Sequence, residues 1–171
     1  MRKIVRFTAL LCLLVLCTVD AFSQKQFDTP LAMNDYLVSH VDSLFILGTD
    51  MGNALGTGVK KKDFSGLAAT KTAIVRYGAA KQAEIRKVKD QFGSEDFRKG
   101  ILDFLEFEMD LMKTKTTLMD KLHSQSTDAE IQAAIDQMIA ESKREEEYLR
   151  KIGLLQEQFA KKNGITLAAT E

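Results

Sequence analysis

Apolar residues recur at alternating three- and four-residue spacing along most of the chain, which is the pattern of amphipathic helices. The pattern is clearest over residues 94–123, where two apolar rows run side by side. One row holds Phe97, Ile101, Phe104, Leu111, Leu118 and Leu122, and the other holds Leu102, Leu105, Met109, Met112 and Met119. Such a broad apolar face is typical of a central bundle helix, so we expect other helices to cover it.

Turn and capping residues divide the chain into four predicted helices. The signals are one proline in a first turn, several helix-ending glycines, and hydroxyl or acidic caps: Pro30, Gly56, Gly58, Gly93, Ser94, Thr127, Glu130 and Gly164. Thr127 and Glu130 have the spacing of a capping box. Together the signals predict helices over residues 31–55, 63–92, 94–123 and 127–163.

The connections between these helices are short, which favours antiparallel neighbours. We therefore predict an all-α fold, an up-down-up-down antiparallel four-helix bundle, over residues 24–164. Residues 165–171 are expected to form a C-terminal tail. No stretch keeps the two-residue alternation of a strand long enough to predict a sheet.

Three glycines, Gly48, Gly52 and Gly56, fall every four residues on one face of the first predicted helix. Each costs up to about 1 kcal/mol relative to alanine inside a helix, so a compensating contact is expected. Close packing against the second helix is our first interpretation, and a ligand groove is the alternative. The second helix offers a matching set of small residues: Ala68, Ala69, Ala73, Ala79, Ala80 and Ala83.

The N-terminus has the pattern of a secretory signal peptide. Arg2, Lys3 and Arg6 precede an apolar run over residues 7–19, and Ala21 with Ser23 supplies small residues at a cleavage site. We predict cleavage after Ser23 and export to the periplasm, the cell surface or the medium. The apolar run is short for a membrane span, and we expect none in the mature chain.

Both cysteines, Cys12 and Cys17, lie inside this predicted signal, so the mature chain would depend on packing alone and have no disulfide. An alternative is a lipoprotein acylated on Cys17. Leu16 stands before that cysteine, where a small residue is wanted, and this favours ordinary cleavage.

Charge and motifs exclude several classes of function. Acidic and basic residues are equal in number, and no basic face with interleaved aromatics predicts nucleic-acid binding. Neither His40 nor His123 lies in the Glu-x-x-His motif of di-iron bundles, and C-x-x-C-H is absent. The sequence contains no motif of a catalytic nucleophile, so it does not predict an enzyme. We therefore expect no enzyme, no cofactor and no metal motif.

Charged residues interrupt the apolar rows near the middle of the predicted bundle. Counting outward from the turns places Asp42, Lys81, Glu108 and Glu145 at similar levels, with His40 nearby. Such side chains usually lie along the core edge with their heads in water. If they point inward they must pair, because a lone buried charge costs several kcal/mol. An inward cluster would be a site for a cation or a small ligand.

The cleavage segment, ending Ala21-Phe22-Ser23-Gln24, and residues 34–38 (NDYLV) resemble a group of exported, surface-assigned helical proteins of Gram-negative bacteria with no established activity. The resemblance implies export and a helical fold. It brings no catalytic residues to this chain.

Two functional hypotheses follow. The first is an exported binding or interaction module whose partner, an unknown protein or small ligand, meets the glycine face or the turn at Lys60, Lys61 and Lys62. The second is a metal- or small-ligand-binding bundle with its site at the mid-bundle charges. Burial separates them: a buried, under-paired carboxylate cluster favours the second, and outward carboxylates favour the first. Oligomeric state stays open.

Overall fold

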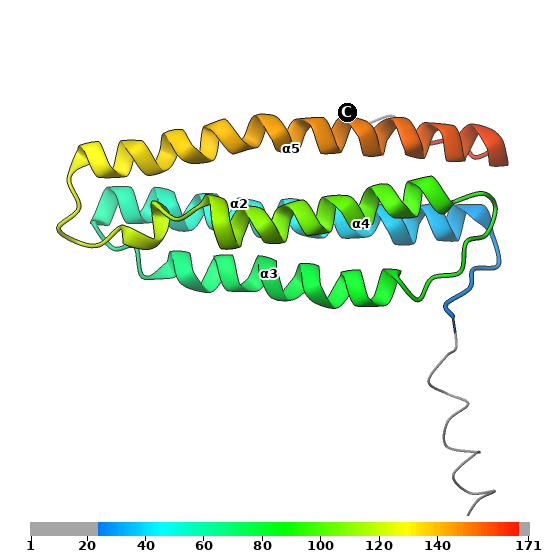
Figure 1. Cartoon of the computed structure of the whole chain (residues 1–171), viewed down its shortest axis with the longest axis horizontal. Coiled ribbons are helices and arrows are strands. Elements are labelled where there is room, and N and C mark those ends of the chain that lie inside the picture. The colour runs from blue at the N-terminus through cyan, green and yellow to red at the C-terminus, as the bar shows by residue number, and fades with distance from the viewer. Residues whose placement is uncertain (1–23, 168–171) are drawn as a thin grey trace, which may run out of the picture.

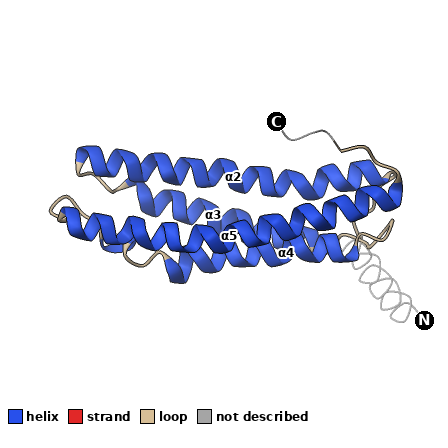
Figure 2. Cartoon of the chain, turned by 90° about the horizontal axis from the view of Figure 1, so that it is seen from above, coloured by secondary structure: helices blue, strands red, loops and turns tan. Residues whose placement is uncertain are grey.

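The computed structural model describes residues 24–167, and this part of the chain is helical, with four long helices that lie side by side along one axis (Figures 1 and 2). They are α2 (Pro30–Lys61), α3 (Gly66–Ile85), α4 (Glu95–Asp110) and α5 (Asp128–Asn163). The predicted all-α fold with four helices is confirmed. The predicted signal peptide, residues 1–23, and residues 168–171 of the predicted tail lie outside the described residues.

Helix α2 begins where the sequence predicts and ends later. The Thr29 hydroxyl accepts a hydrogen bond from the Ala32 N–H at 3.1 Å, and Pro30 occupies the first turn. The predicted end at residue 55 is wrong, because Gly56 and Gly58 lie within the helix and Lys62, with φ 56°, ends it. Gly58 has a packing role: a Cβ there would lie 2.5 Å from the Phe64 ring.

Helix α3 is shorter than the predicted 63–92. Residues 86–92 instead form a connection that pairs with the N-terminal segment: the Lys25 N–H donates to Lys87 O at 2.9 Å, and the Lys89 N–H donates to Lys25 O at 3.0 Å. Gln91 extends this pairing through its amide, which accepts from the Phe27 N–H at 2.8 Å. A contact across 64 residues therefore replaces the last helical turns that local pattern predicts.

The predicted single helix over 94–123 is also wrong, because its second half is broken. After α4 come a π-helical turn, η2 (Leu111–Lys115), and a 3₁₀ turn, η3 (Met119–Lys121). The buried Thr116 stands at the break, where its hydroxyl donates to Met112 O at 3.0 Å. The buried Lys71 ammonium reaches from α3 to Thr116 O at 3.4 Å and pairs with the Asp120 carboxylate.

Helix α5 matches its prediction within one residue. Thr127 and Glu130 form the capping box, and Gly164, with φ 63°, ends the helix. The tail begins packed rather than loose, since Ile165 lies against the core.

The buried apolar residues form two cores along the bundle axis. The larger core, defined as core A, is built from all four helices and includes Leu37, Leu44, Ile74, Ile101, Phe104, Leu105, Ile152 and Phe159. The smaller, core B, lies toward η3 and contains Phe64, Leu67, Met119, Ile131 and Ala134. Helix α4 contacts the other three helices, as expected for its broad apolar face.

The glycine face of α2 does not pack closely on α3, so our first interpretation of it is wrong. A Cβ at Gly48, Gly52 or Gly56 would meet no atom within 4 Å. Close helix approaches occur elsewhere: a Cβ at Gly78 would lie 2.7 Å from Met109 Cγ, and one at Gly100 would lie 2.7 Å from Leu155 Cδ1. The buried row of α2 turns its glycines outward, and the alanines of α3 are mostly exposed too.

Candidate ligand-binding groove

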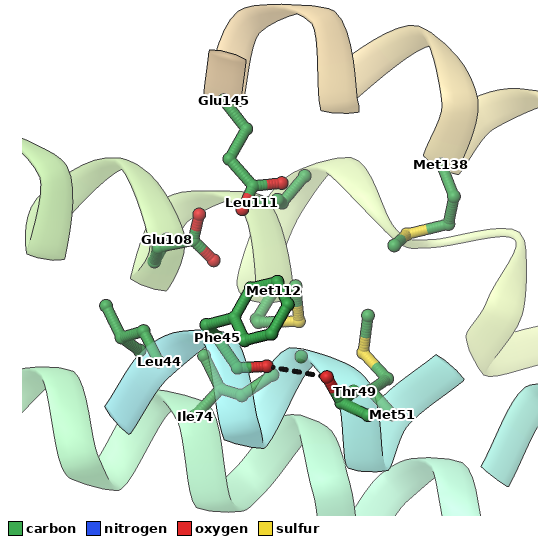
Figure 3. A pocket seen from close by; sticks show the side chains of 11 residues that line it. Leu44, Phe45, Thr49, Met51, Ile74, Glu108, Leu111, Met112, Met138 and Glu145 are labelled. Atoms are coloured by element: carbon green, nitrogen blue, oxygen red, sulfur yellow. Dashed lines mark hydrogen bonds between the residues drawn. The ribbon is translucent and has the colours of Figure 1, made fainter. Parts of the chain in front are cut away.

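A groove of about 300 Å³ opens at the middle of the bundle between α2 and α5, with α4 as its floor (Figure 3). Most of its lining is apolar: Leu44, Met51, Ile74, Leu111, Met112 and Met138. Its polar side chains are Thr49 of α2, Glu108 of α4 and Glu145 of α5. The size lies at the lower end of the range for small-molecule pockets, and an apolar wall with few polar groups is typical of such sites.

Glu108 occupies a core position. It follows Phe97, Ile101 and Phe104 at three- and four-residue spacing, so the row that buries those side chains also buries this carboxyl. Only 6 % of the residue is exposed, and Oε1 is buried without a hydrogen-bond partner among the described residues. Burial, with a smaller effect of the Glu145 charge, raises the pKa of Glu108 to about 8. Glu108 is therefore mostly protonated at neutral pH.

Glu145 faces Glu108 across the groove. Figure 3 shows its side chain pointing from α5 toward the Glu108 carboxyl. Glu145 is half-buried, and burial, followed by the charge of Glu146, raises its pKa. Because Glu145 is the less buried of the two, it ionises first, and its carboxylate then opposes ionisation of Glu108. No lysine, arginine or histidine lines the groove among the described residues.

The π-helical turn η2 shapes the floor of the groove. It starts three residues after Glu108, and its first two residues, Leu111 and Met112, both line the cavity. A π turn widens the helix locally and is common at functional sites. The Thr116 hydroxyl donates a hydrogen bond to Met112 O and so stabilises the wider turn.

The rim on α2 is formed by small and exposed residues. Phe45 is 76 % exposed, and Gly48 leaves open space where any other residue would carry a side chain. Both line the groove, together with Thr49, whose hydroxyl donates to Phe45 O at 2.9 Å. Of the predicted glycine face, Gly48 therefore borders a groove, as the alternative interpretation expected, whereas Gly52 and Gly56 do not line it.

The structure brings together two of the four predicted site residues. Glu108 and Glu145 share the groove, but Asp42 is exposed on α2 and does not line it. Lys81 pairs with Glu84 on its own helix at 2.9 Å and does not line the groove either. Counting from the turns correctly placed Glu108 and Glu145 at one level along the axis. Which side chains at that level point inward depends on the rotation of each helix, which the count does not contain.

Lys81 belongs to a separate aromatic cluster around His40. The His40 ring is 5 % exposed, and its Nδ1 lies 3.1 Å from the Tyr77 hydroxyl. Neither His40 Nε2 nor the Tyr36 hydroxyl has a hydrogen-bond partner in the described structure. Burial, then the positive charge of Lys81, lowers the pKa of His40. The ammonium of Lys25 lies 3.5 Å above the Tyr36 ring and fixes the N-terminal segment there.

Sequence reasoning did not identify the apolar part of the groove. Met51, Met112 and Met138 look like ordinary core residues in the sequence, and Phe45 only joins the apolar rows. The signal that could have found the site is the coincidence of two irregularities at one level: a carboxyl inside the richest apolar row and glycines on the facing helix.

Within residues 24–167, no group of three His, Cys, Asp or Glu side chains is placed to hold a metal ion. The helices of the same residues include none long and apolar enough to cross a membrane. Comparison with protein families, with curated proteins and with solved structures found no match to this chain.

Proposed function

We propose that this chain is an exported helical bundle that binds a small ligand in the groove between α2 and α5. The observation that carries the proposal is the buried Glu108 carboxyl, which lines the groove and has an oxygen without a partner. A buried polar atom that lacks a hydrogen bond costs about 1–3 kcal/mol, and a ligand that supplies the bond recovers that cost.

An apolar residue at position 108 would complete the row that contains Ile101 and Phe104. A carboxyl in the lining of an accessible groove can be explained by a ligand that forms the missing hydrogen bond. Binding is favoured over catalysis because the lining pairs two carboxyls with apolar side chains and a Thr49 hydroxyl that is already engaged. Between the two hypotheses from the sequence, burial of Glu108 thus favours the ligand site.

Two finer predictions from the sequence belong to this proposal. Export rests on the signal-peptide pattern of residues 1–23. The up-down-up-down order of the helices is supported by their short connections and by the run of colour in Figure 1, which reverses from one helix to the next.

The second candidate function is protein interaction through the outer face of α2. Phe45 and Ile46, which are neighbours on α2, are 76 % and 62 % exposed. Adjacent exposed apolar side chains favour contact with another protein. In that case Ile46→Ser, which lies outside the groove lining, would abolish association and leave small-molecule binding unchanged.

A fluorescent apolar probe tests the ligand site directly. N-phenylnaphthylamine is uncharged and brightens when it leaves water. We expect it to bind the wild-type protein and to bind Gly48→Leu at least about ten-fold more weakly, because the new side chain fills the groove. Gly52→Leu is the matched control, since Gly52 is equally open and lies on the same helix outside the groove. Equal probe binding by the two variants would refute the proposed site.

A further inference from the structure

We propose that the ligand of the groove is an organic cation: a small apolar body that carries an ammonium group, held by the Glu108 and Glu145 carboxyls. This inference rests on the proposed function and adds the chemical class of the ligand. It stands on four properties of the groove, namely its charge, its hydrogen-bonding atoms, its aromatic rim and its size.

The ionisable side chains that line the groove are both acidic. Glu108 comes from α4 and Glu145 from α5, and Glu146 adds a further negative charge next to Glu145. Helices α2 and α3 face the pair with uncharged residues, among them Leu44 and Ile74. An anionic ligand would add repulsion to a site that already disfavours two negative charges, whereas a cation cancels it.

The polar atoms of the groove lack a donor once both acids ionise. Carboxylates only accept hydrogen bonds. The Thr49 hydroxyl has given its hydrogen to Phe45 O, so toward the groove it too can only accept. A ligand that satisfies all three groups must therefore be rich in N–H donors, and an ammonium group supplies three.

Phe45 adds a face for a positive charge. Figure 3 shows its ring at the border of the groove, and the residue is 76 % exposed. The face of an aromatic ring attracts an ammonium group, and the attraction grows as the cation loses water. An exposed aromatic ring beside two carboxyls thus favours a cation over a neutral alcohol of equal shape.

The remaining wall sets the body of the ligand. Met51, Met112 and Met138 are flexible thioethers, which adapt to aliphatic and aromatic groups of varied shape. A volume of about 300 Å³ admits a small aromatic molecule or a short chain and excludes a large amphiphile. The ligand class is therefore a small aralkyl- or alkylammonium ion.

Proton release distinguishes this ligand from a neutral one. An ammonium group favours the Glu108 carboxylate, so a proton leaves the site on binding. At pH values below the pKa of Glu108, which is about 8, affinity should therefore increase with increasing pH, by up to about ten-fold per pH unit. A neutral acceptor would instead bind the protonated acid and lose affinity as pH rises. The two classes thus have pH dependences of opposite sign.

The experiment is a titration of the purified protein with phenethylamine, phenethyl alcohol and phenylacetate, followed by amide chemical shifts. We expect the amine to bind at least about ten-fold more tightly than the alcohol at neutral pH, and the carboxylate not to bind. Glu108→Gln, which leaves the Glu145 carboxyl in place, should reduce both this preference and the rise of affinity with pH. Asp42→Asn, the same change at an exposed site on α2, should leave both intact.

The outcomes separate the two proposals. If N-phenylnaphthylamine binds but phenethyl alcohol binds as tightly as phenethylamine, the proposed cationic ligand is wrong and the proposed ligand-binding groove is supported. If Asp42→Asn weakens binding of the amine as much as Glu108→Gln does, the amine is bound by surface charge and the inference fails. If no probe reaches the groove, both proposals fail. Should Glu108→Gln not fold, Glu145→Gln and the wild-type pH profile give the same decision.

Discussion

At the scale of single residues, Glu108 makes the stability of the protein depend on pH. Its pKa is about 8 in the folded state and near 4.5 in the unfolded chain, so the folded state retains a proton that the unfolded state has lost. Stability is therefore full below about pH 4.5 and falls as pH rises toward 8, by about 5 kcal/mol at most. Glu108→Gln, which mimics the protonated acid, should remove this fall. Urea unfolding at neutral and alkaline pH measures it.

The buried His40 acts in the opposite sense and sets the useful pH range for that comparison. Its pKa is lowered in the folded state, so the unfolded chain takes up a proton first and stability falls as pH drops below about 6.5. Above that pH His40 no longer contributes, so the difference between wild type and Glu108→Gln reports the effect of Glu108. If wild type and Glu108→Gln lost stability in parallel between neutral and alkaline pH, the buried carboxyl would not be the cause.

At the scale of elements, a single lysine stabilises the break that follows α4. The Lys71 ammonium donates to the Thr116 carbonyl and pairs with Asp120, so it joins α3 to the end of η2 and to η3. Lys71→Met should reduce the free energy of unfolding by about 1–3 kcal/mol, because a buried carbonyl loses its partner. Hydrogen exchange should accelerate over residues 116–121.

Lys81→Met is the control for that prediction. Lys81 is half-exposed and pairs within its own helix with Glu84, so its loss should cost less than about 1 kcal/mol. Equal effects of the two substitutions would show that Lys71 does not hold the break.

Two glycines on neighbouring helices should respond in opposite directions to the same change. Gly56→Ala adds a methyl group in open space on α2 and should raise stability by about 0.5–1 kcal/mol through helix propensity. Gly78→Ala would place its Cβ 2.7 Å from Met109 Cγ, so the buried Met109 or helix α4 must shift, and we expect a cost of about 1–3 kcal/mol. Thermal unfolding compares them. A stabilising Gly78→Ala would mean that Met109 simply moves aside.

Helix ends were predictable where the cause is local. Helix α5 was predicted within one residue because Thr127, Glu130 and Gly164 carry their own capping geometry. The ends of α3 and α4 were not, because Lys25 pairs beside Val88 and Lys71 reaches Thr116 across the bundle. Such contacts join residues far apart in sequence, and periodicity contains no information about them.

At the scale of the whole molecule, the candidate site was predictable in part. The bundle arrangement brings the last turn of α4 and the middle of α5 to one level, which is why Glu108 and Glu145 meet. The same argument failed for Asp42, because the rotation of α2 turns it outward, and for Lys81, which lies beside Tyr77 in the cluster around His40. The groove itself comes from the spacing of α2 and α5 above α4, which follows from how all four helices pack.

The two cores are separated by a boundary within the bundle. Core A and core B are separate groups of buried residues, and Met138, which lines the groove, packs against both. The smaller core, with the broken segment beside it, is expected to open and close many times while the larger core stays folded. A molecule seated in the groove contacts core A directly and core B only through Met138. Through that one side chain, a bound ligand would couple the opening of the smaller core to that of the larger.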